Sequence, residues 1–279
     1  MIIMKKEEIK RVVREGYAKI AEGSPCCTPS SSCCGNPSSP QDISRELGYS
    51  EEECKAVPEG ANLGLGCGNP VALASLKEGE IVLDLGSGAG FDCFLAASKV
   101  GLTGRVIGID MTPEMIDKAR ENAKRGQFSN VEFRLGEVEN IPAADNSVDI
   151  IISNCVINLA PDKRRVFKEA FRVLKLGGRF MISDIVLLKE LPGFMKNSVQ
   201  AYVGCLSGAI MKEGYINAIK NAGFQEVEIV DQTSFPIEYM ANDPTAKALI
   251  ADSKIKAEDI KELAQSIQSI KVSGIKPLR

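Results

Sequence analysis

Residues 81–92 are the stretch that most constrains how this chain folds. They begin with the apolar run Ile81-Val82-Leu83, carry an acid at Asp84, and then hold glycines at positions 86, 88 and 90. An apolar run that breaks into glycines before a helical segment is typical of a buried parallel strand turning tightly into a helix. Glycines let the backbone approach a ligand, and the free N–H groups of a helix start face the same ligand. The stretch predicts a nucleotide or nucleoside site.

The glycine spacing distinguishes between ligands. A dinucleotide fingerprint, G-x-G-x-x-G, needs its third glycine at position 91, which is Phe91 here. The next predicted strand, residues 105–110, ends at Asp110, where a carboxylate can accept both hydroxyls of a ribose. Strand, glycine turn, helix, strand and acid in this order favour a bound nucleoside over a purely structural turn.

The composition narrows the class of partner. The chain has 279 residues, of which 44% are hydrophobic, and its 34 basic and 37 acidic side chains leave a formal net charge of −3. This balance predicts neither a nucleic-acid partner nor binding to an anionic membrane surface. The apolar runs are shorter than a spanning helix, and residues 1–4 are too short for a signal-peptide core. We expect a small-molecule substrate and a reducing, cytoplasmic location, with no membrane.

Histidine and tryptophan are absent, whereas nine cysteines are present. Without histidine, any proton transfer must use Asp, Glu, Lys, Tyr or Cys. Cysteines in a reducing compartment favour thiolate ligation or redox chemistry over a disulfide scaffold, and an odd number cannot pair completely within one chain.

The N-terminal region predicts a helix and a cysteine-rich segment. Apolar residues at helical spacing over residues 5–22 predict a helix that ends at Gly23. Residues 24–40 hold two Cys-Cys pairs among serines and prolines, a composition that predicts a mobile loop. The spacing of these pairs is not a standard zinc pattern, so metal binding, resolving thiols and incidental cysteines all stay open. Short helical segments are expected at residues 44–47 and 50–54.

From residue 81 onward, predicted strands and helices alternate, which indicates an α/β fold with a parallel sheet covered on both faces. Thr112 is expected to cap the second helix, and Gly177-Gly178 to stop the third. The expected strands are residues 81–85, 105–110, 131–135, 148–153 and 179–185, and the expected helices are 91–100, 113–126 and 162–176.

The pattern loosens after residue 185. Residues 192–213 are expected to cover the carboxyl edge of the sheet, where open α/β sheets bind ligands. A helix at 214–223, a strand at 226–231, a largely helical stretch at 243–268 and a last strand at 270–275 complete the prediction.

Three stretches resemble the class I S-adenosylmethionine-dependent methyltransferases: residues 84–90 followed by Asp110, residues 136–142, and residues 174–180. The resemblance spans roughly residues 60–275. It implies a Rossmann-like, seven-stranded, mostly parallel sheet with an antiparallel last strand, and S-adenosyl-L-methionine as cofactor. The implied cofactor-binding residues are Asp84, Gly86, Ser87, Gly88, Gly90, Asp110, Met111, Glu137, Val138 and Asn154.

Residues 66–70, 153–163 and 204–209 narrow the resemblance to the arsenite methyltransferases. The middle stretch puts a cysteine directly beyond a predicted strand. The resemblance implies that Cys67, Cys155 and Cys205 hold trivalent arsenic as the catalytic ligands. The glycines around Cys67 either expose its sulfur on flexible backbone or only form an ordinary turn. The family's additional N-terminal cysteine cannot be aligned uniquely. The competing residues are Cys26, Cys27, Cys33, Cys34 and Cys54, of which Cys33, Cys34 and Cys54 are the possible redox thiols.

The resemblance also implies a mechanism. Trivalent arsenic is soft and suits thiolates, and its lone pair would attack the sulfonium methyl without needing a base. Because the transfer oxidises the arsenic, thiols and then thioredoxin or glutathione would return it to the trivalent state. The implied partners are therefore arsenite, or its thiol adducts, and this reductant.

The implied organisation has three parts. Residues 1–60 form an N-terminal helical, cysteine-rich extension, residues 61–188 the Rossmann-like cofactor domain, and residues 189–279 an arsenic-binding lid with the last strands of the sheet.

Two alternatives share parts of this prediction. A class I methyltransferase acting on a quinone or another small organic metabolite would have the same cofactor half and incidental cysteines. A non-catalytic, thiol-based metalloid-binding or redox module would bind arsenic without forming a methylated product, although the intact cofactor motif argues against it. Cys93 is expected to pack in the core, and structural roles stay open for Asp84, Asp149, Asn154 and Asn158.

Overall fold

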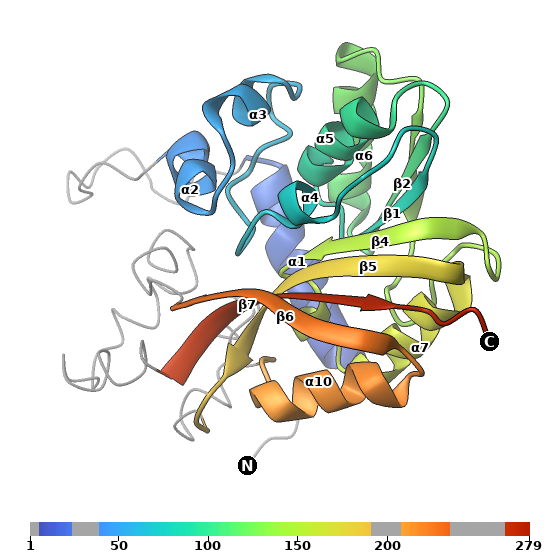
Figure 1. The fold of residues 1–279 in the computed structure, drawn as a ribbon. Helices are drawn as coiled ribbons and strands as arrows, with labels where there is room; N and C mark the ends of the chain where they lie inside the picture. The colour runs from blue at the N-terminus through green and yellow to red at the C-terminus, as the bar shows by residue number, and fades with distance from the viewer. Residues whose placement is uncertain (1–5, 24–38, 191–207, 235–265) are drawn as a thin grey trace, which may run out of the picture.

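Figure 1 shows the computed structural model, which describes residues 6–23, 39–190, 208–234 and 266–279. One seven-stranded sheet has the order β3-β2-β1-β4-β5-β7-β6. The first five strands pair in parallel, and β7 is antiparallel to both of its neighbours. This confirms the predicted seven-stranded α/β fold. The strands are β1 (Ile81–Leu85), β2 (Arg105–Asp110), β3 (Val131–Leu135), β4 (Val148–Asn154), β5 (Leu174–Leu187), β6 (Gln225–Ser234) and β7 (Ile267–Ile275).

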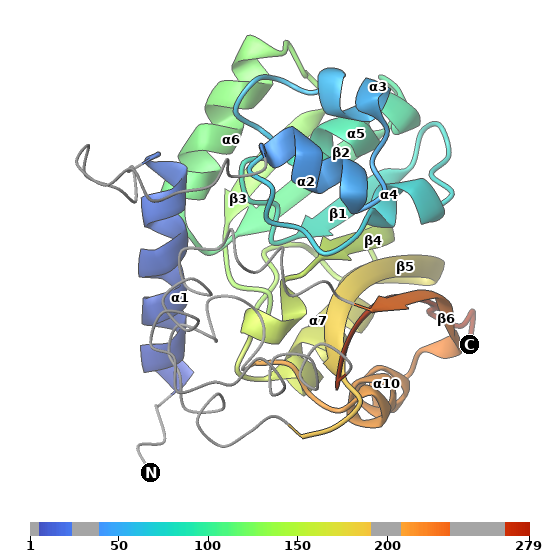
Figure 2. The ribbon, with the colours of Figure 1, turned by 90° about the vertical axis from the view of Figure 1, so that its left-hand side faces the viewer.

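Helices cover both faces of the sheet, as Figures 1 and 2 show. On one face, α4 (Pro70–Leu73), α5 (Phe91–Val100) and α6 (Pro113–Arg125) pack in one hydrophobic cluster. On the other face, α7 (Lys163–Val173) and α10 (Lys212–Asn221) pack in a second cluster. Because both faces are buried, the central strands read as nearly continuous apolar runs rather than alternating ones.

The N-terminal helix lies across the carboxyl edge of the sheet. The predicted helix at residues 5–22 is observed as α1 (Lys6–Ala21), whose C-terminal end lies beside α6 in Figure 2. Its apolar residues Ile9, Val13 and Tyr17 belong to a third cluster with Cys155 and Ile185, which come from the ends of β4 and β5. Two further helices, α2 (Pro40–Glu46) and α3 (Glu51–Lys55), and the short 3₁₀ turn η1 (Ile157–Leu159) complete the described part.

The predicted boundary between the third helix and the fifth strand is wrong. The helix α7 ends at Val173 instead of residue 176, and β5 begins at the next residue. Leu174 pairs with Val148 while Arg179 pairs with Ile150, so residues 175–178 form an irregularity within the strand. The Lys276 ammonium donates to the carbonyl oxygens of Phe171 and Leu174 and so satisfies the helix end. Gly177 and Gly178 therefore shape the irregularity and do not stop the helix.

Other differences lie near the chain's C-terminal part. The predicted helix at 243–268 falls mostly outside the described residues, but its end is wrong, because Ile267 and Gln268 belong to β7 and pair with Leu187 and Val186 of β5. Most of the predicted cover at 192–213 lies outside the described ranges, as do all four cysteines of the Cys-Cys pairs in residues 24–40. The division of the chain near residues 60 and 188 stays a prediction. Within the described ranges, no helix is long and apolar enough to cross a membrane.

Two leucines provide a matched test of this core. Leu83 in β1 is fully buried, whereas Leu102 is 86% exposed. We expect Leu83→Ala to lower the free energy of unfolding by about 2–5 kcal/mol, because it removes buried methyl groups and leaves a cavity. Leu102→Ala is expected to change it by less than about 0.5 kcal/mol. Urea unfolding measures both values, and equal effects would contradict this description of the core.

Candidate functional site

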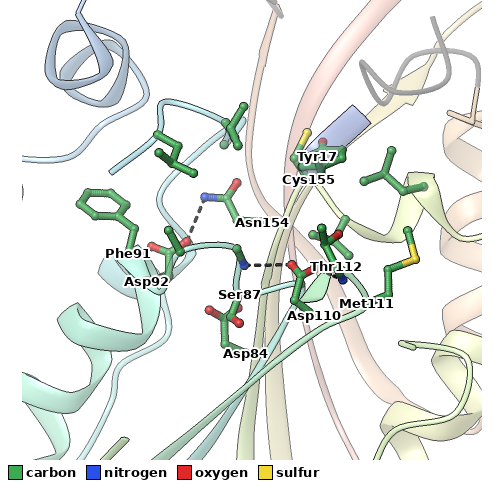
Figure 3. A pocket seen from close by; sticks show the side chains of 18 of the residues that line it. Tyr17, Asp84, Ser87, Phe91, Asp92, Asp110, Met111, Thr112, Asn154 and Cys155 are labelled. Atoms are coloured by element: carbon green, nitrogen blue, oxygen red, sulfur yellow. Dashed lines mark hydrogen bonds between the residues drawn. The ribbon is translucent and has the colours of Figure 1, made fainter. Parts of the chain in front are cut away.

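A cavity opens at the carboxyl edge of the sheet, where β1, β2 and β4 end (Figure 3). Its empty space is about 1080 Å³, part of which is open to solvent. Gly90 is the N-cap of α5, and the other predicted cofactor-binding residues all line the cavity, namely Asp84, Gly86, Ser87, Gly88, Asp110, Met111, Glu137, Val138 and Asn154.

The glycine turn between β1 and α5 forms one wall. Gly86, Gly88 and Gly90 have φ angles of 71°, 51° and 97°, in the left-handed region that favours glycine. A Cβ on Gly86 would lie 2.2 Å from Val156 Cγ2, so this position also needs the missing side chain. Ser87 Oγ is buried on the same wall without a hydrogen-bond partner in the described part of the chain. A buried, unpaired hydroxyl on a cavity wall is suited to a ligand.

Asp110 faces this turn from the end of β2. One carboxylate oxygen accepts from the Gly88 N–H at 3.0 Å, and the other accepts from the Thr112 N–H at 2.8 Å. Burial raises the pKa of Asp110, although these hydrogen bonds oppose the shift. Thr112 occupies the predicted N-cap position of α6, but its side chain makes no cap hydrogen bond. The carboxylate is thus held in place while lining the cavity.

Two more buried acids lie beside the turn. Burial raises the pKa of Asp92 to about 6, against the hydrogen bonds from Tyr49 and Asn154. Burial, and then the charge of Asp92, raise the pKa of Asp84 well above its ordinary value. The Cys93 thiol is buried in the core, where it donates to Asp84 at 3.2 Å. Two carboxyl groups desolvated together favour a cation as their neighbour.

Cys67 and Cys155 come together at the far side of this edge. Their sulfur atoms and a carboxylate oxygen of Asp184 all lie within 4.8 Å of one another. Cys155 lines the cavity, as Figure 3 shows, and Cys67 precedes α4. Three of the predicted thiols, Cys33, Cys34 and Cys205, lie outside the described residues.

The expectation that glycines expose the sulfur of Cys67 is wrong, because Cys67 is only 3% exposed. The neighbouring glycines instead allow close packing. A Cβ on Gly66 would lie 2.7 Å from the Asn154 amide nitrogen, and one on Gly68 would lie 2.3 Å from Ser183 Oγ. The loop is therefore pressed against the ends of β4 and β5.

Cys155 has a left-handed backbone conformation, which residues other than glycine rarely adopt. Its φ is 60°, and its N–H donates to the Ser183 carbonyl at 2.8 Å. Left-handed backbone at a residue other than glycine is uncommon and concentrates at functional sites. The turn directs the chain out of the sheet at the position of the thiol.

Sequence reasoning missed Asp184, which is fully buried in β5. It accepts hydrogen bonds from the Tyr215 hydroxyl, the Asn158 amide and the Ile185 N–H, each at 2.9 Å. Burial raises its pKa to about 7. An acid inside the apolar run Ile182-Ser183-Asp184-Ile185 was the signal that could have identified it.

Sequence reasoning also missed Lys10, which anchors α1 beside the cavity. Its ammonium lies 2.7 Å from a carboxylate oxygen of Glu137 and 3.1 Å from one of Glu139. All three side chains line the cavity, together with Val13 and Tyr17 of the same helix. The helix therefore closes one side of the space.

The structure also shows the positions of the predicted candidates Cys54 and Asp149. Cys54 is half-buried on α3, where burial and the charge of Glu53 raise the pKa of its thiol, which disfavours the thiolate. Asp149 accepts from the Ile81 N–H and pairs with Lys175, which is a structural role.

The glycine turn gives a matched pair of substitutions. Gly88→Ala meets open space, so we expect only the backbone strain of a left-handed residue, about 1–2 kcal/mol. Gly86→Ala has the same strain and also collides with Val156, which adds about 1–3 kcal/mol. Urea unfolding of both variants tests this order, and a Gly86→Ala protein as stable as Gly88→Ala would contradict it.

Known proteins are similar to this chain in sequence. An arsenite methyltransferase of Halobacterium salinarum is 46% identical over 256 residues, which are 88% of this chain and 65% of that protein. An arsenite methyltransferase of Homo sapiens is 37% identical over 182 residues, 62% of this chain and 48% of that protein. The chain thus spans slightly less than two thirds of the length of the first relative and about half of the second.

A solved structure of a related protein has a fold similar to that of this chain. The arsenic(III) S-adenosylmethionine methyltransferase of Chlamydomonas reinhardtii is 29% identical, with a TM-score of 0.61 over 84% of this chain and 73% of that one. Residues 76–223 match a family model described as a methyltransferase domain. That match covers more than half of the chain, and the sheet order agrees with a Rossmann-like methyltransferase. The chain therefore belongs to the methyltransferase-domain family.

Proposed function

We propose that this chain methylates trivalent arsenic, taking the methyl group from S-adenosyl-L-methionine. The observation that carries the proposal is the position of Cys155, which lines the same cavity as the glycine turn and Asp110 while its sulfur lies beside that of Cys67. Relatives and a structural neighbour named as arsenite methyltransferases support arsenite as the substrate.

The residues of the cavity fit the proposed methyl donor. Asp110 offers a fixed carboxylate for ribose hydroxyls, and the buried Ser87 hydroxyl offers a hydrogen bond that the described residues leave unused. Asp84 and Asp92 would favour a cation beside the glycine turn. When bound, S-adenosylmethionine supplies an electrophilic methyl group on a sulfonium centre.

The cysteines are proposed to hold the arsenic. Cys67, Cys155 and Cys205 would supply three thiolates, which suit a soft trivalent centre. Arsenic bound in this way would keep a lone pair as the nucleophile, with S-adenosylhomocysteine as the leaving group, so the step would need no base. A chain without histidine agrees with that chemistry. The contribution of the protein is alignment of the two reactants away from water, worth up to about 7–11 kcal/mol for a well-oriented pair.

The proposal includes a reductant and a location. Methyl transfer oxidises the arsenic, so a thiol must supply electrons, and the resulting disulfide must be reduced by thioredoxin or glutathione. Cys33 and Cys34 are proposed as redox thiols, and Cys54 is a weaker candidate because its pKa is raised. Such reductants work in a reducing cytoplasm, which is the proposed location.

The proposal is tested by mass spectrometry of arsenic species. Purified protein is incubated with arsenite, S-adenosylmethionine and thiol, beside the variants Cys67→Ser, Cys155→Ser and Cys205→Ser. We expect methylarsenic from the wild type and at least about a hundredfold less from each variant, because a misplaced reactant loses that much. Cys93→Ser is the matched control, since a serine hydroxyl can still donate to Asp84 from the core.

Two outcomes would contradict the proposal. Wild-type protein that binds S-adenosylmethionine but forms no methylarsenic would point to an organic acceptor such as a quinone. Methylarsenic formed at the wild-type rate by all three variants would remove the cysteines from the reaction.

The raised pKa of Asp92 predicts a pH dependence of donor binding. With a pKa of about 6, the ionised fraction of this carboxyl rises about tenfold between pH 5 and 7.5. Because the ionised form attracts a sulfonium, we expect affinity for S-adenosylmethionine to rise by up to about tenfold over this range. Affinity for S-adenosylhomocysteine, whose sulfur is neutral, should rise less, and Asp92→Asn should remove the difference. Calorimetric titration measures this, and parallel pH profiles for the two ligands would contradict it.

A further inference from the structure

Asn154 lies beside both parts of the proposed site, namely the part for the methyl donor and the part formed by the thiols of Cys67 and Cys155. It is the last residue of β4 and lines the cavity, directly before Cys155. Its position pairs with Ser183 of β5, and the neighbouring strand β1 leads into the glycine turn. One amide side chain therefore lies next to both the place proposed for the methyl donor and the thiol pair.

The Asn154 amide nitrogen faces the donor side. It donates to Asp92 Oδ2 at 3.1 Å and to the Tyr49 hydroxyl oxygen at 2.9 Å, and the Tyr49 hydroxyl in turn donates to Asp92 Oδ1 at 2.7 Å. Figure 3 shows the amide pointing toward Asp92. Asp92 is thus held by two neutral donors, both of which depend on its charge for their strength.

The Asn154 side chain also fixes the loop that carries Cys67, one of the proposed arsenic ligands. Asn154 Oδ1 accepts from the Cys67 N–H at 2.9 Å, and its amide nitrogen donates to the Gly68 carbonyl at 2.7 Å. These bonds span 87 and 86 positions of sequence. The lack of a side chain at Gly66 makes them possible, since a Cβ there would lie 2.7 Å from the amide. The loop that carries Cys67 is therefore fixed to Asn154 on both sides of the thiol residue.

The Asn154 side-chain amide has more hydrogen-bond acceptors in reach than it has N–H groups. Its two N–H groups have three acceptors in reach, namely Asp92, Tyr49 and the Gly68 carbonyl. A cation beside Asp92 draws on the negative charge of the carboxylate, which weakens its bond to the amide and leaves more of the amide hydrogens to the Gly68 carbonyl. The orientation of the amide then decides how firmly Oδ1 holds the Cys67 N–H.

We propose that Asn154 is a positioning residue that couples the two substrates, so that a cationic methyl donor at Asp92 and trivalent arsenic at Cys67 and Cys155 each tighten the binding of the other. The proposal rests on the proposed function, and it adds that the two affinities are linked through one amide. By linkage, each ligand must change the affinity of the other by the same factor.

The test measures this factor directly. Arsenite affinity is measured with and without saturating sinefungin, an unreactive analogue that carries an amine in place of the methylsulfonium. Sinefungin affinity is then measured with and without arsenite, which closes the cycle. For the wild type we expect each ligand to improve the affinity of the other by about tenfold.

Two variants distinguish coupling of the two ligand affinities through Asn154 from a simple contact between Asn154 and one ligand. Asn154→Ala removes both halves of the bridge. Asn154→Asp has nearly the same shape and can still accept from the Cys67 N–H, but it cannot donate to Asp92, so it tests the bridge even if the alanine variant folds poorly. Both should bring the coupling factor close to one. The matched control is Asn130→Ala, which removes an amide bonded to the carbonyls of Ala97 and Gly101, away from the cavity, and should keep the wild-type factor.

The outcomes are distinct. A factor near one in the wild type, or a tenfold factor retained in Asn154→Asp, overturns the proposal while leaving the proposed function in place, because binding of each ligand is still observed. If Asn154→Asp weakens sinefungin binding but leaves the factor unchanged, Asn154 is only a donor contact, and the proposal is also overturned. Wild-type protein that binds no arsenite contradicts the proposed function itself and overturns this proposal with it.

Discussion

The parallel pairing of β4 between β1 and β5 is the constraint on which the site depends. Parallel strands leave a sheet at the same edge, so the residues that follow β1 and β4 must meet there. The glycine turn after β1, the thiol after β4 and the acid within β5 are far apart in sequence, yet this pairing brings them to one edge. The loop that carries Cys67 then needs only to lie against that edge, which its glycines permit.

The site concentrates groups that are costly to bury. Asp84, Asp92 and Asp184 are almost or fully inaccessible to solvent, and burial raises the pKa of each. Each is bonded by donors without a formal charge: Cys93 for Asp84, Tyr49 and Asn154 for Asp92, and a tyrosine, an asparagine and a backbone N–H for Asp184. The charge of Lys163 also acts on Asp184, whereas the described hydrogen-bond partners of Asp84 and Asp92 are all uncharged. A cationic ligand would supply charge beside Asp84 and Asp92, so these two acids are better explained by binding than by stability.

Local signals were enough to predict the centre of the sheet. The ends of β1, α5 and β2 agree with prediction because glycines, an acid and an apolar run mark them within a few residues. The end of α7 was mispredicted because Lys276, about a hundred positions later, satisfies its last carbonyls. The burial of Cys67 and the bridging role of Asn154 were equally hidden, since both depend on packing between distant segments. The acid of β5 was visible in the sequence, but only the fold places it beside the two thiols.

The position of β7 determines the order in which the sheet can assemble. This strand lies between β5 and β6 although it follows both in sequence. During synthesis, the five parallel strands can form before β7 exists, whereas β6 and α10 are made before the strand that attaches them to the sheet. The edge of β5 therefore stays unpaired for as long as the intervening residues are being added. An unpaired edge can pair with another chain, so the partly made sheet keeps an edge open to association until residues 267–275 are added.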